Sequence, residues 1–118
     1  MRTYVDDASF FFGPDGFPGP GPNAVWRRYA LRLARLIEAG APLLPGEVRE
    51  TLVDCSRRPG RRPCLGLLWV KKLEDQRIYA VCPACQGERH FITRWELTDY
   101  AEGPMPPISG DELPPSRW

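Results

Sequence analysis

Four cysteines constrain the fold of this chain more than any other feature of its sequence. They form two pairs: CSRRPGRRPC brackets a basic loop, and CPAC is a tight knuckle. Between the pairs lies LGLLWVKKLEDQRIYAV, which is typical of two short strands joined by a polar turn. Two cysteine pairs at opposite ends of a hairpin can supply the four thiolates of a tetrahedral zinc site. The sequence therefore predicts one structural Zn²⁺ whose ligands are Cys55, Cys64, Cys82 and Cys85.

Short strands are expected on both sides of the cysteines. Thr51 and Val53 are β-branched residues in the stretch that precedes the first cysteine, which favours a strand there. Residues 65–70, 77–81 and 90–93 fit the three strands of a small antiparallel sheet, a zinc ribbon. Because such a sheet buries little apolar surface, the metal should supply much of the free energy of folding. The expected core over the metal consists of Leu68, Val70, Ile78, Ala80, Phe91 and Trp95.

The clearest helix signal covers residues 24–39, AVWRRYALRLARLIEA. Asn23 is a good N-cap, and Gly40 suits the position after the last turn. At about 100° per residue, one face of this helix is apolar. The opposite face carries arginines, which form either a solvated face or a surface that contacts phosphate groups. Leu31 lies among these polar positions and is a candidate for a dimer or partner contact.

The loop between the first two cysteines is basic and contains no acid. Its arginines either offset the negative charge of the thiolate site or bind an anionic partner, for which nucleic acid is the first candidate. The formal net charge of +1 argues against bulk coating of nucleic acid but permits a local phosphate contact. Trp69 and Trp95 are either stacking platforms for bases or buried aromatic residues. The candidate anion-binding residues are Arg57, Arg58, Arg61 and Arg62 of the loop and Arg28, Arg32 and Arg35 of the helix.

Both ends of the chain are rich in Pro and Gly, which divides the sequence into four parts. Residues 1–23 form an aromatic Gly-Pro arm, whose phenylalanines at 10–12 either pack on the rest of the protein or dock on a partner. The amphipathic helix follows at 24–40 and the zinc-ribbon domain at 50–100. Residues 101–118 form a Pro-rich tail that is biased to polyproline II geometry.

The sequence also carries information about the compartment. No apolar run reaches the roughly 18 residues that a membrane-spanning helix needs. The first residues contain acids, Gly and Pro where an export signal has a continuous apolar region. We therefore predict a cytoplasmic protein without a membrane partner, in which paired cysteines are metal ligands rather than disulfides.

Enzymatic chemistry has little support in the sequence. CPAC matches a thiol–disulfide redox motif, but that chemistry needs its first cysteine at a helix N-terminus within a thioredoxin-like arrangement. Four cysteines fill the zinc coordination sphere and leave no open position for catalysis. His90 is the only histidine, has no acidic cluster near it in the sequence, and is interpreted as a surface or sheet residue. We therefore expect neither an enzyme nor a small-molecule substrate.

Three stretches of the chain carry a resemblance to known proteins. CSRRPGRRPCLGLLWV, IYAVCPACQG and ITRWELTDY resemble a group of small uncharacterised bacterial proteins with a C-terminal zinc-ribbon-like module. The resemblance covers residues of about 50–100. It implies that the four cysteines are metal ligands, and it implies no activity. More generally, this region looks like the ribbons of transcription and RNA-handling proteins.

These patterns together predict an α+β protein whose N-terminal amphipathic helix packs on a small antiparallel zinc-ribbon sheet. The function that follows is non-enzymatic zinc binding, with the basic loop presented to an anionic partner such as nucleic acid. The alternative is a protein–protein interaction adaptor that uses the aromatic arm, the helix and the Pro-rich tail.

Overall fold

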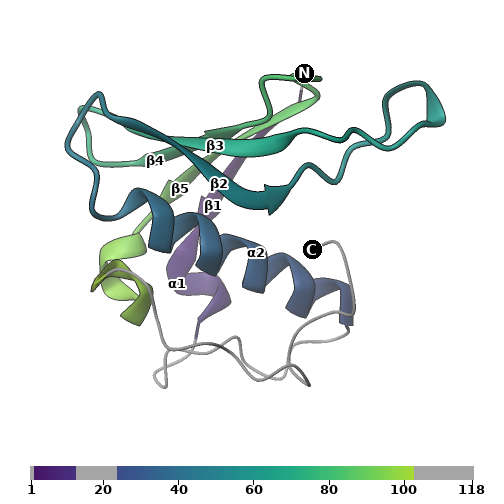
Figure 1. Cartoon of the computed structure of the whole chain (residues 1–118). Coiled ribbons are helices and arrows are strands. Elements are labelled where there is room, and N and C mark those ends of the chain that lie inside the picture. Colours follow the sequence, from purple (N-terminus) through teal and green to yellow (C-terminus); the bar gives the residue numbers. More distant parts are fainter. Residues whose placement is uncertain (1, 13–23, 103–118) are drawn as a thin grey trace.

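The computed structural model describes residues 2–12 and 24–102 (Figure 1). The predicted N-cap Asn23, most of the aromatic arm and the tail from residue 103 lie outside these residues. The helices are α1 (Ala8–Phe11) and α2 (Ala24–Gly40), and three short 3₁₀ turns are η1 (Pro59–Arg61), η2 (Trp95–Leu97) and η3 (Asp99–Glu102). The strands are β1 (Arg2–Asp7), β2 (Val48–Asp54), β3 (Leu67–Lys72), β4 (Ile78–Val81) and β5 (Glu88–Thr93).

The sheet is larger than the sequence predicts, and it is mixed. It has five strands in the order β1-β5-β4-β3-β2. β1 pairs with β5 in parallel, from Arg2 opposite Glu88 to Asp7 opposite Thr93, while the other three pairs are antiparallel. The three predicted antiparallel strands are present as β3, β4 and β5, but the expectation of a small, purely antiparallel sheet is wrong, because β1 adds a parallel edge and the whole sheet has five strands. The parallel pairing was not predicted because β1 and β5 lie at opposite ends of the described chain, and no local sequence pattern reveals that they pair.

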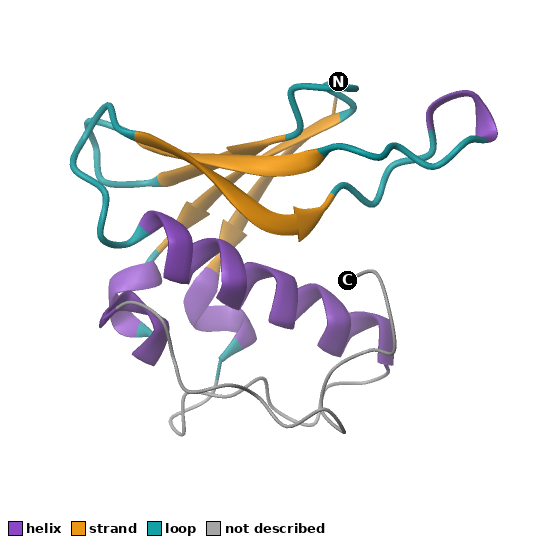
Figure 2. Cartoon of the chain, viewed as in Figure 1, coloured by secondary structure: helices purple, strands orange, loops and turns teal. Residues whose placement is uncertain are grey.

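Both α-helices lie on one side of the sheet, which makes the architecture a two-layer α+β fold (Figure 2). α2 contacts β2, β3 and β4, and its Leu33 and Ile37 are buried in the core. The C-terminal end of α2 approaches β4 closely. A Cβ atom on Gly40 would lie 2.8 Å from Ile78 Cγ2, so glycine is required for this approach. The other side of the sheet has no helix of the described chain upon it.

Two side chains are placed differently from the prediction. Leu31, a candidate for a dimer or partner contact, is only 3% exposed and is buried within the protein. The buried arc of α2 is wider than the single apolar stripe seen in the sequence, because residues 30, 31, 33, 34, 36, 37 and 40 are all buried. Phe91, expected in the core, is half-buried on the opposite side of β5 from the buried Ile92.

The segment between α2 and β2 is held by a buried lysine. Lys72 is 2% exposed, and its Nζ donates to the backbone oxygens of Ala41 at 2.9 Å and Leu43 at 3.1 Å. The same Nζ lies 4.2 Å from the ring centroid of Trp95. The cation therefore satisfies two carbonyl groups beyond the end of α2 and packs on a buried aromatic ring.

No helix within residues 2–12 and 24–102 combines the length and the apolar character that crossing a membrane requires.

Candidate metal centre

The two cysteine pairs occupy equivalent places in the sheet. Cys55 directly follows β2 and Cys82 directly follows β4, while Cys64 and Cys85 lie in the loops that lead into β3 and β5. Backbone hydrogen bonds shape both loops: Cys64 N donates to Arg57 O at 3.0 Å, and Gln86 N donates to Cys82 O at 2.9 Å. Adjacent antiparallel strands thus deliver both loops to the same end of the sheet.

The four sulfurs meet at this end. Their Sγ atoms all lie within 4.8 Å of one another. Cys55 Sγ is 3.6 Å from Cys85 Sγ, and Cys64 Sγ is 3.6 Å from Cys82 Sγ, so each of these contacts joins the two loops. In a tetrahedral site with Zn–S distances of ~2.3 Å, the sulfurs are ~3.8 Å apart. All four cysteines are free thiols, and their spacing is compatible with a metal-binding site.

Two glycines allow the loops to close around the sulfurs. A Cβ atom on Gly66 would lie 2.8 Å from Cys82 Sγ and 2.9 Å from Ala84 Cβ, so a larger residue would displace the CPAC knuckle. The Gly66 amide also donates to Cys64 Sγ at 3.4 Å. At Gly87, a Cβ atom would meet Arg57 Nε at 3.1 Å and Cys85 Sγ at 3.5 Å. A side chain at position 66 would therefore displace the sulfur cluster, whereas one at position 87 would require the Arg57 side chain to shift by a few tenths of an ångström.

Burial makes the sulfur cluster dependent on a cation. Burial raises the pKa of the Cys55 thiol, the backbone amide of Arg57 lowers it, and the neighbouring thiols raise it further. The net effect favours the neutral thiol in the absence of a metal ion. A bound divalent cation reverses this preference, because it stabilises thiolates directly.

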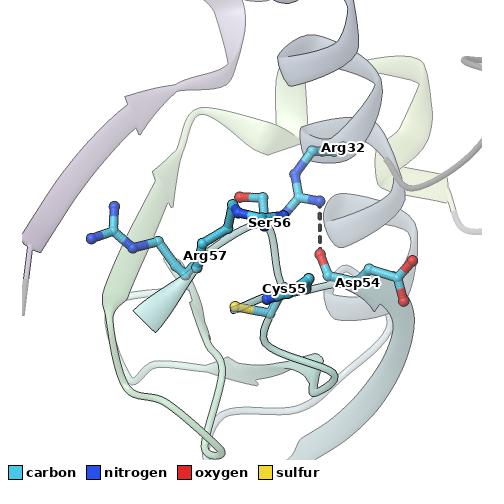
Figure 3. A pocket seen from close by; sticks show the side chains of 7 residues that line it. Arg32, Asp54, Cys55, Ser56 and Arg57 are labelled. Atoms are coloured by element: carbon cyan, nitrogen blue, oxygen red, sulfur yellow. Dashed lines mark hydrogen bonds between the residues drawn. The ribbon is translucent and has the colours of Figure 1, made fainter. Parts of the chain in front are cut away.

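Arginines from two elements surround this centre. Arg32 of α2 donates from Nη1 to Asp54 O at 2.7 Å, and burial lowers the pKa of its guanidinium. Arg57 Nη1 lies 3.8 Å from Glu88 Oε2. Together with Arg58, these side chains line a cavity of about 210 Å³ beside Cys55 (Figure 3).

The remaining candidate arginines, which are Arg28, Arg35, Arg61 and Arg62, do not line this cavity. Arg58 donates from Nη2 to the backbone oxygen of Arg61, and Arg61 and Arg62 are exposed near the tip of the loop. Arg28 is exposed and donates from Nε to Ala24 O. Arg35 forms an ion pair with Glu38 at 3.2 Å. The seven candidate arginines thus occupy three places: the cavity, the loop tip and the exposed side of α2.

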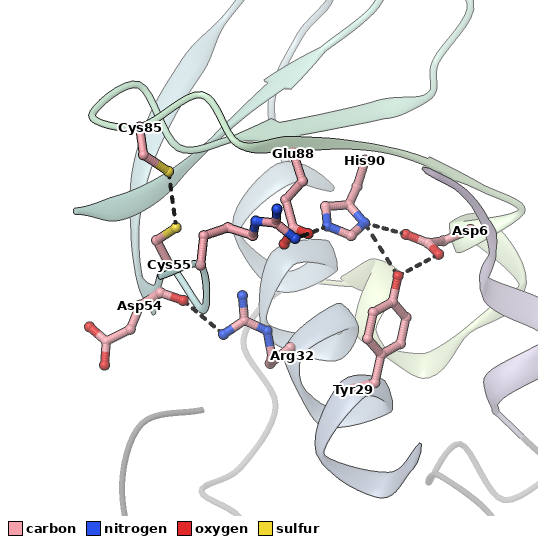
Figure 4. A network of polar contacts seen from close by, with 9 residues as sticks. Asp6, Tyr29, Arg32, Asp54, Cys55, Cys85, Glu88 and His90 are labelled. Carbon is pink, nitrogen blue, oxygen red and sulfur yellow. Dashed lines mark hydrogen bonds and ion pairs between the residues drawn. The ribbon is translucent and has the colours of Figure 1, made fainter. Parts of the chain in front are cut away.

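A buried polar cluster, which the sequence did not reveal, lies next to the metal centre (Figure 4). His90 Nδ1 is 2.8 Å from Asp6 Oδ2, and His90 Nε2 is 3.4 Å from Glu88 Oε1. Tyr29 donates its hydroxyl to Asp6 Oδ1 at 2.7 Å, and the Tyr4 ring stacks on the imidazole with centroids 5.0 Å apart. The cluster joins β1, α2 and β5, and Glu88 connects it to Arg57 of the cysteine loop.

Contacts within this cluster shift the pKa values of its members. Burial alone would lower the pKa of His90, but the hydrogen bonds and charges of Asp6 and Glu88 outweigh burial and raise it to about 9. The same contact with His90 lowers the pKa of Glu88. Burial, with the hydrogen bond to Asp6, raises the pKa of Tyr29. His90 is therefore an imidazolium held between two carboxylates at neutral pH.

The sequence interpretation of His90 as a surface or sheet residue was right about the sheet, since His90 lies in β5, but wrong about the surface and about nearby acids. The residue is buried rather than on the surface, and two acids flank it. Glu88 lies two residues before His90 and so faces the same side of β5, which is a signal that strand alternation could have supplied. Asp6 is separated from His90 by 84 residues and gives no local signal.

The fold and the sulfur cluster define an α+β protein with a candidate metal centre. Comparisons with models of protein families, with curated proteins and with solved structures find no match to this chain. The resemblance to a zinc-ribbon family therefore stays a prediction, and functional inference rests on the residues themselves.

Proposed function

We propose that this chain is a non-enzymatic zinc-binding protein that presents a basic loop to an anionic partner. The class of partner that we favour is nucleic acid. The observation that carries the proposal is the approach of four Sγ atoms to within 4.8 Å of one another. Four soft thiolate ligands in a tetrahedral arrangement favour Zn²⁺ over harder divalent cations such as Mg²⁺ or Ca²⁺. A site with four protein ligands is closed to substrate, which supports a structural role.

The exposed part of the loop is the best candidate for the anionic contact. Arg57 is near Glu88, and Arg32 is bonded to a backbone carbonyl, so both help to neutralise groups beside the metal centre. Arg58, Arg61 and Arg62 are exposed on a segment that projects away from the sheet (Figure 1). Three guanidinium groups on a projecting loop suit contacts with successive phosphates.

The adaptor alternative has less support from the described residues. Phe11 stacks on Trp26 at 5.7 Å between ring centroids, and Phe12 is 8% exposed and packs on Tyr100. Leu31 is also buried. Phe12 and Leu31 are buried and Phe11 is half-buried against the core, so these three side chains offer little apolar surface to a partner.

Native mass spectrometry of protein purified without added metal tests the zinc site. We expect one zinc per chain, and loss of that zinc when Cys82 and Cys85 are both replaced by Ser. Ser56→Ala, a change in the same loop region but outside the sulfur cluster, should retain the metal. Purification of a metal-free protein with reduced, reactive thiols would refute the zinc site.

Salt dependence tests the basic loop. Binding of a labelled nucleic acid should weaken steeply as salt rises, and a triple Ala variant of Arg58, Arg61 and Arg62 should lose most of it. A matched triple Ala variant changes the same total charge elsewhere and should retain most binding. Its sites are the exposed residues Arg27, Arg49 and Arg94. If both variants lose the same amount of binding, the affinity depends only on net charge, and the loop is not a specific contact.

A further inference from the structure

The side of the sheet opposite α2 presents aromatic and basic side chains in two rows. The outward positions of the strands are set by the alternation that buries Leu68, Ile78 and His90 on the helix side. In the first row, Trp69 lies opposite Val81, and Val81 lies opposite Arg89. In the second row, Lys71 lies opposite Tyr79, Tyr79 opposite Phe91, and Phe91 opposite Val5. Each of the three central strands therefore contributes one aromatic ring to this face.

These rings are accessible and lie close together. Trp69 is 37% exposed, and Tyr79 and Phe91 are half-buried with ring centroids 5.2 Å apart. The guanidinium carbon of Arg77 lies 4.9 Å from the Phe91 ring centroid, and that of Arg89 lies 5.6 Å from it. Arg77 Nε also donates to Asp75 Oδ2 at 2.7 Å and Arg89 Nε to Thr3 Oγ1 at 2.9 Å, so both guanidinium groups are held beside the Phe91 ring.

A shallow apolar groove of about 360 Å³ crosses the same face. It is lined by Val48, Trp69, Lys71, Tyr79, Val81 and Pro83, among others. Its floor is apolar and aromatic, so it offers planar contacts rather than hydrogen-bonding groups. Such a surface fits a flat, unpaired ring system better than it fits the edge of a duplex.

The charge on this face selects the partner. The outward positions of β3, β4 and β5 carry Lys71 and Arg89 and no acid, and Arg77 adjoins β4. Asp75 forms an ion pair with Arg77 at 2.7 Å and so partly neutralises its charge. The acid in register with Trp69 is Glu50, on the neighbouring strand β2. The cations of this face therefore lie on β3 and β5, away from the acid on β2, and a phosphate backbone would lie along them.

We propose that this face binds single-stranded nucleic acid. Bases stack on Trp69, Tyr79 and Phe91, and Lys71 and Arg89 contact the phosphates. The inference rests on the proposed function for the class of partner, but it assigns base contacts to a surface other than the cysteine loop. Aromatic rings on a sheet with cations between them are the arrangement by which sheet surfaces bind unpaired bases.

Fluorescence anisotropy with the zinc-loaded full chain tests this inference. The probe is a fluorescein-labelled oligothymidylate of about 12 nucleotides at low salt. We expect Trp69→Ala to weaken binding about tenfold or more, because each base–aromatic stack contributes that order of affinity. Trp69→Phe should retain most affinity, and Leu97→Ala, at a 73% exposed position of η2 outside the sheet, should leave it unchanged. A duplex of the same length should bind more weakly than the single strand.

The outcomes separate this face from the cysteine loop. Loss of binding in Trp69→Ala, with the fold and zinc content intact, supports the inference. Unchanged binding in Trp69→Ala, with loss in the triple loop variant, overturns it and leaves the proposed function in place. Absence of binding to any single strand at low salt also overturns it, as does a preference of this face for an apolar peptide. Because Trp69 is partly exposed, its replacement tests binding without removing a core residue.

Discussion

Replacing His90 by Gln should destabilise the protein by an amount that depends on pH. The imidazolium lies between Asp6 and Glu88, which raise its pKa from 6.5 to about 9. At ~1.4 kcal/mol per pKa unit, this shift corresponds to a pH-dependent contribution of roughly 3 kcal/mol to the free energy of unfolding. The variant loses this contribution at every pH, so only the wild type should show the pH dependence that belongs to His90.

The sign follows from the direction of the shift. A raised pKa means that the folded state binds the proton more tightly, so the stabilisation is complete below pH 6.5 and is lost as pH rises through about 9. Below neutral pH a second effect enters, because His90 lowers the pKa of Glu88 from 4.5. That stabilisation is present above pH 4.5 and is lost as Glu88 becomes protonated. The difference in the free energy of unfolding between the wild type and His90→Gln should therefore be largest between about pH 4.5 and pH 6.5.

Urea unfolding of the zinc-loaded protein at about pH 6 and about pH 10 measures this contribution. The difference in unfolding free energy between wild type and His90→Gln should shrink by roughly 3 kcal/mol over this interval. Titrating groups that do not contact His90 cancel because they are common to both proteins. Tyr29→Phe removes only the hydroxyl group and should cost about 1 kcal/mol at both pH values. A constant difference between wild type and His90→Gln would refute the assignment of a charged His90.

Three further changes test other parts of the structure. Gly66→Ala should lower zinc affinity in a competition titration, since its Cβ would lie 2.8 Å from a cluster sulfur, whereas Ser56→Ala, at an exposed position of the loop after Cys55, should not. Lys72→Met should lower the free energy of unfolding, measured by chemical denaturation, by about 2–4 kcal/mol, because it removes the donor to two carbonyls. Lys71→Met, the control, should lower it by less than about 0.5 kcal/mol. Equal losses would contradict a special role for Lys72. Leu31→Ala should cost about 2–5 kcal/mol in the same assay, and a negligible cost would argue against its burial.

Features with a local sequence signal were predictable. The apolar periodicity predicts a helix over residues 24–39, and α2 occupies Ala24–Gly40. Pairs of cysteines at the ends of a hairpin predict that the sulfurs meet, and the Sγ atoms lie within 4.8 Å. In each case, the residues that decide the structure are near one another in the chain or are joined by one short hairpin.

Features that depend on distant contacts were not predictable. Residues 2–7 carry no pattern that pairs them with β5, so the parallel edge of the sheet was missed. The His90 cluster was missed for the same reason, because it forms only when β1 brings Asp6 beside β5. Arg32 belongs to the polar side of α2 by sequence, yet it lies against Asp54 because the end of β2 packs beside that part of the helix. Partial burial of an arginine depends on what the fold places against it, which periodicity alone does not contain.

Zinc X-ray absorption spectroscopy of the purified protein is the most direct measurement of the metal centre. Four sulfur neighbours at ~2.3 Å, with no nitrogen or oxygen neighbour in the coordination sphere, are the expected result. A sphere that contains nitrogen or oxygen ligands, or a protein without zinc whose cysteines form disulfides, would contradict the four-thiolate centre.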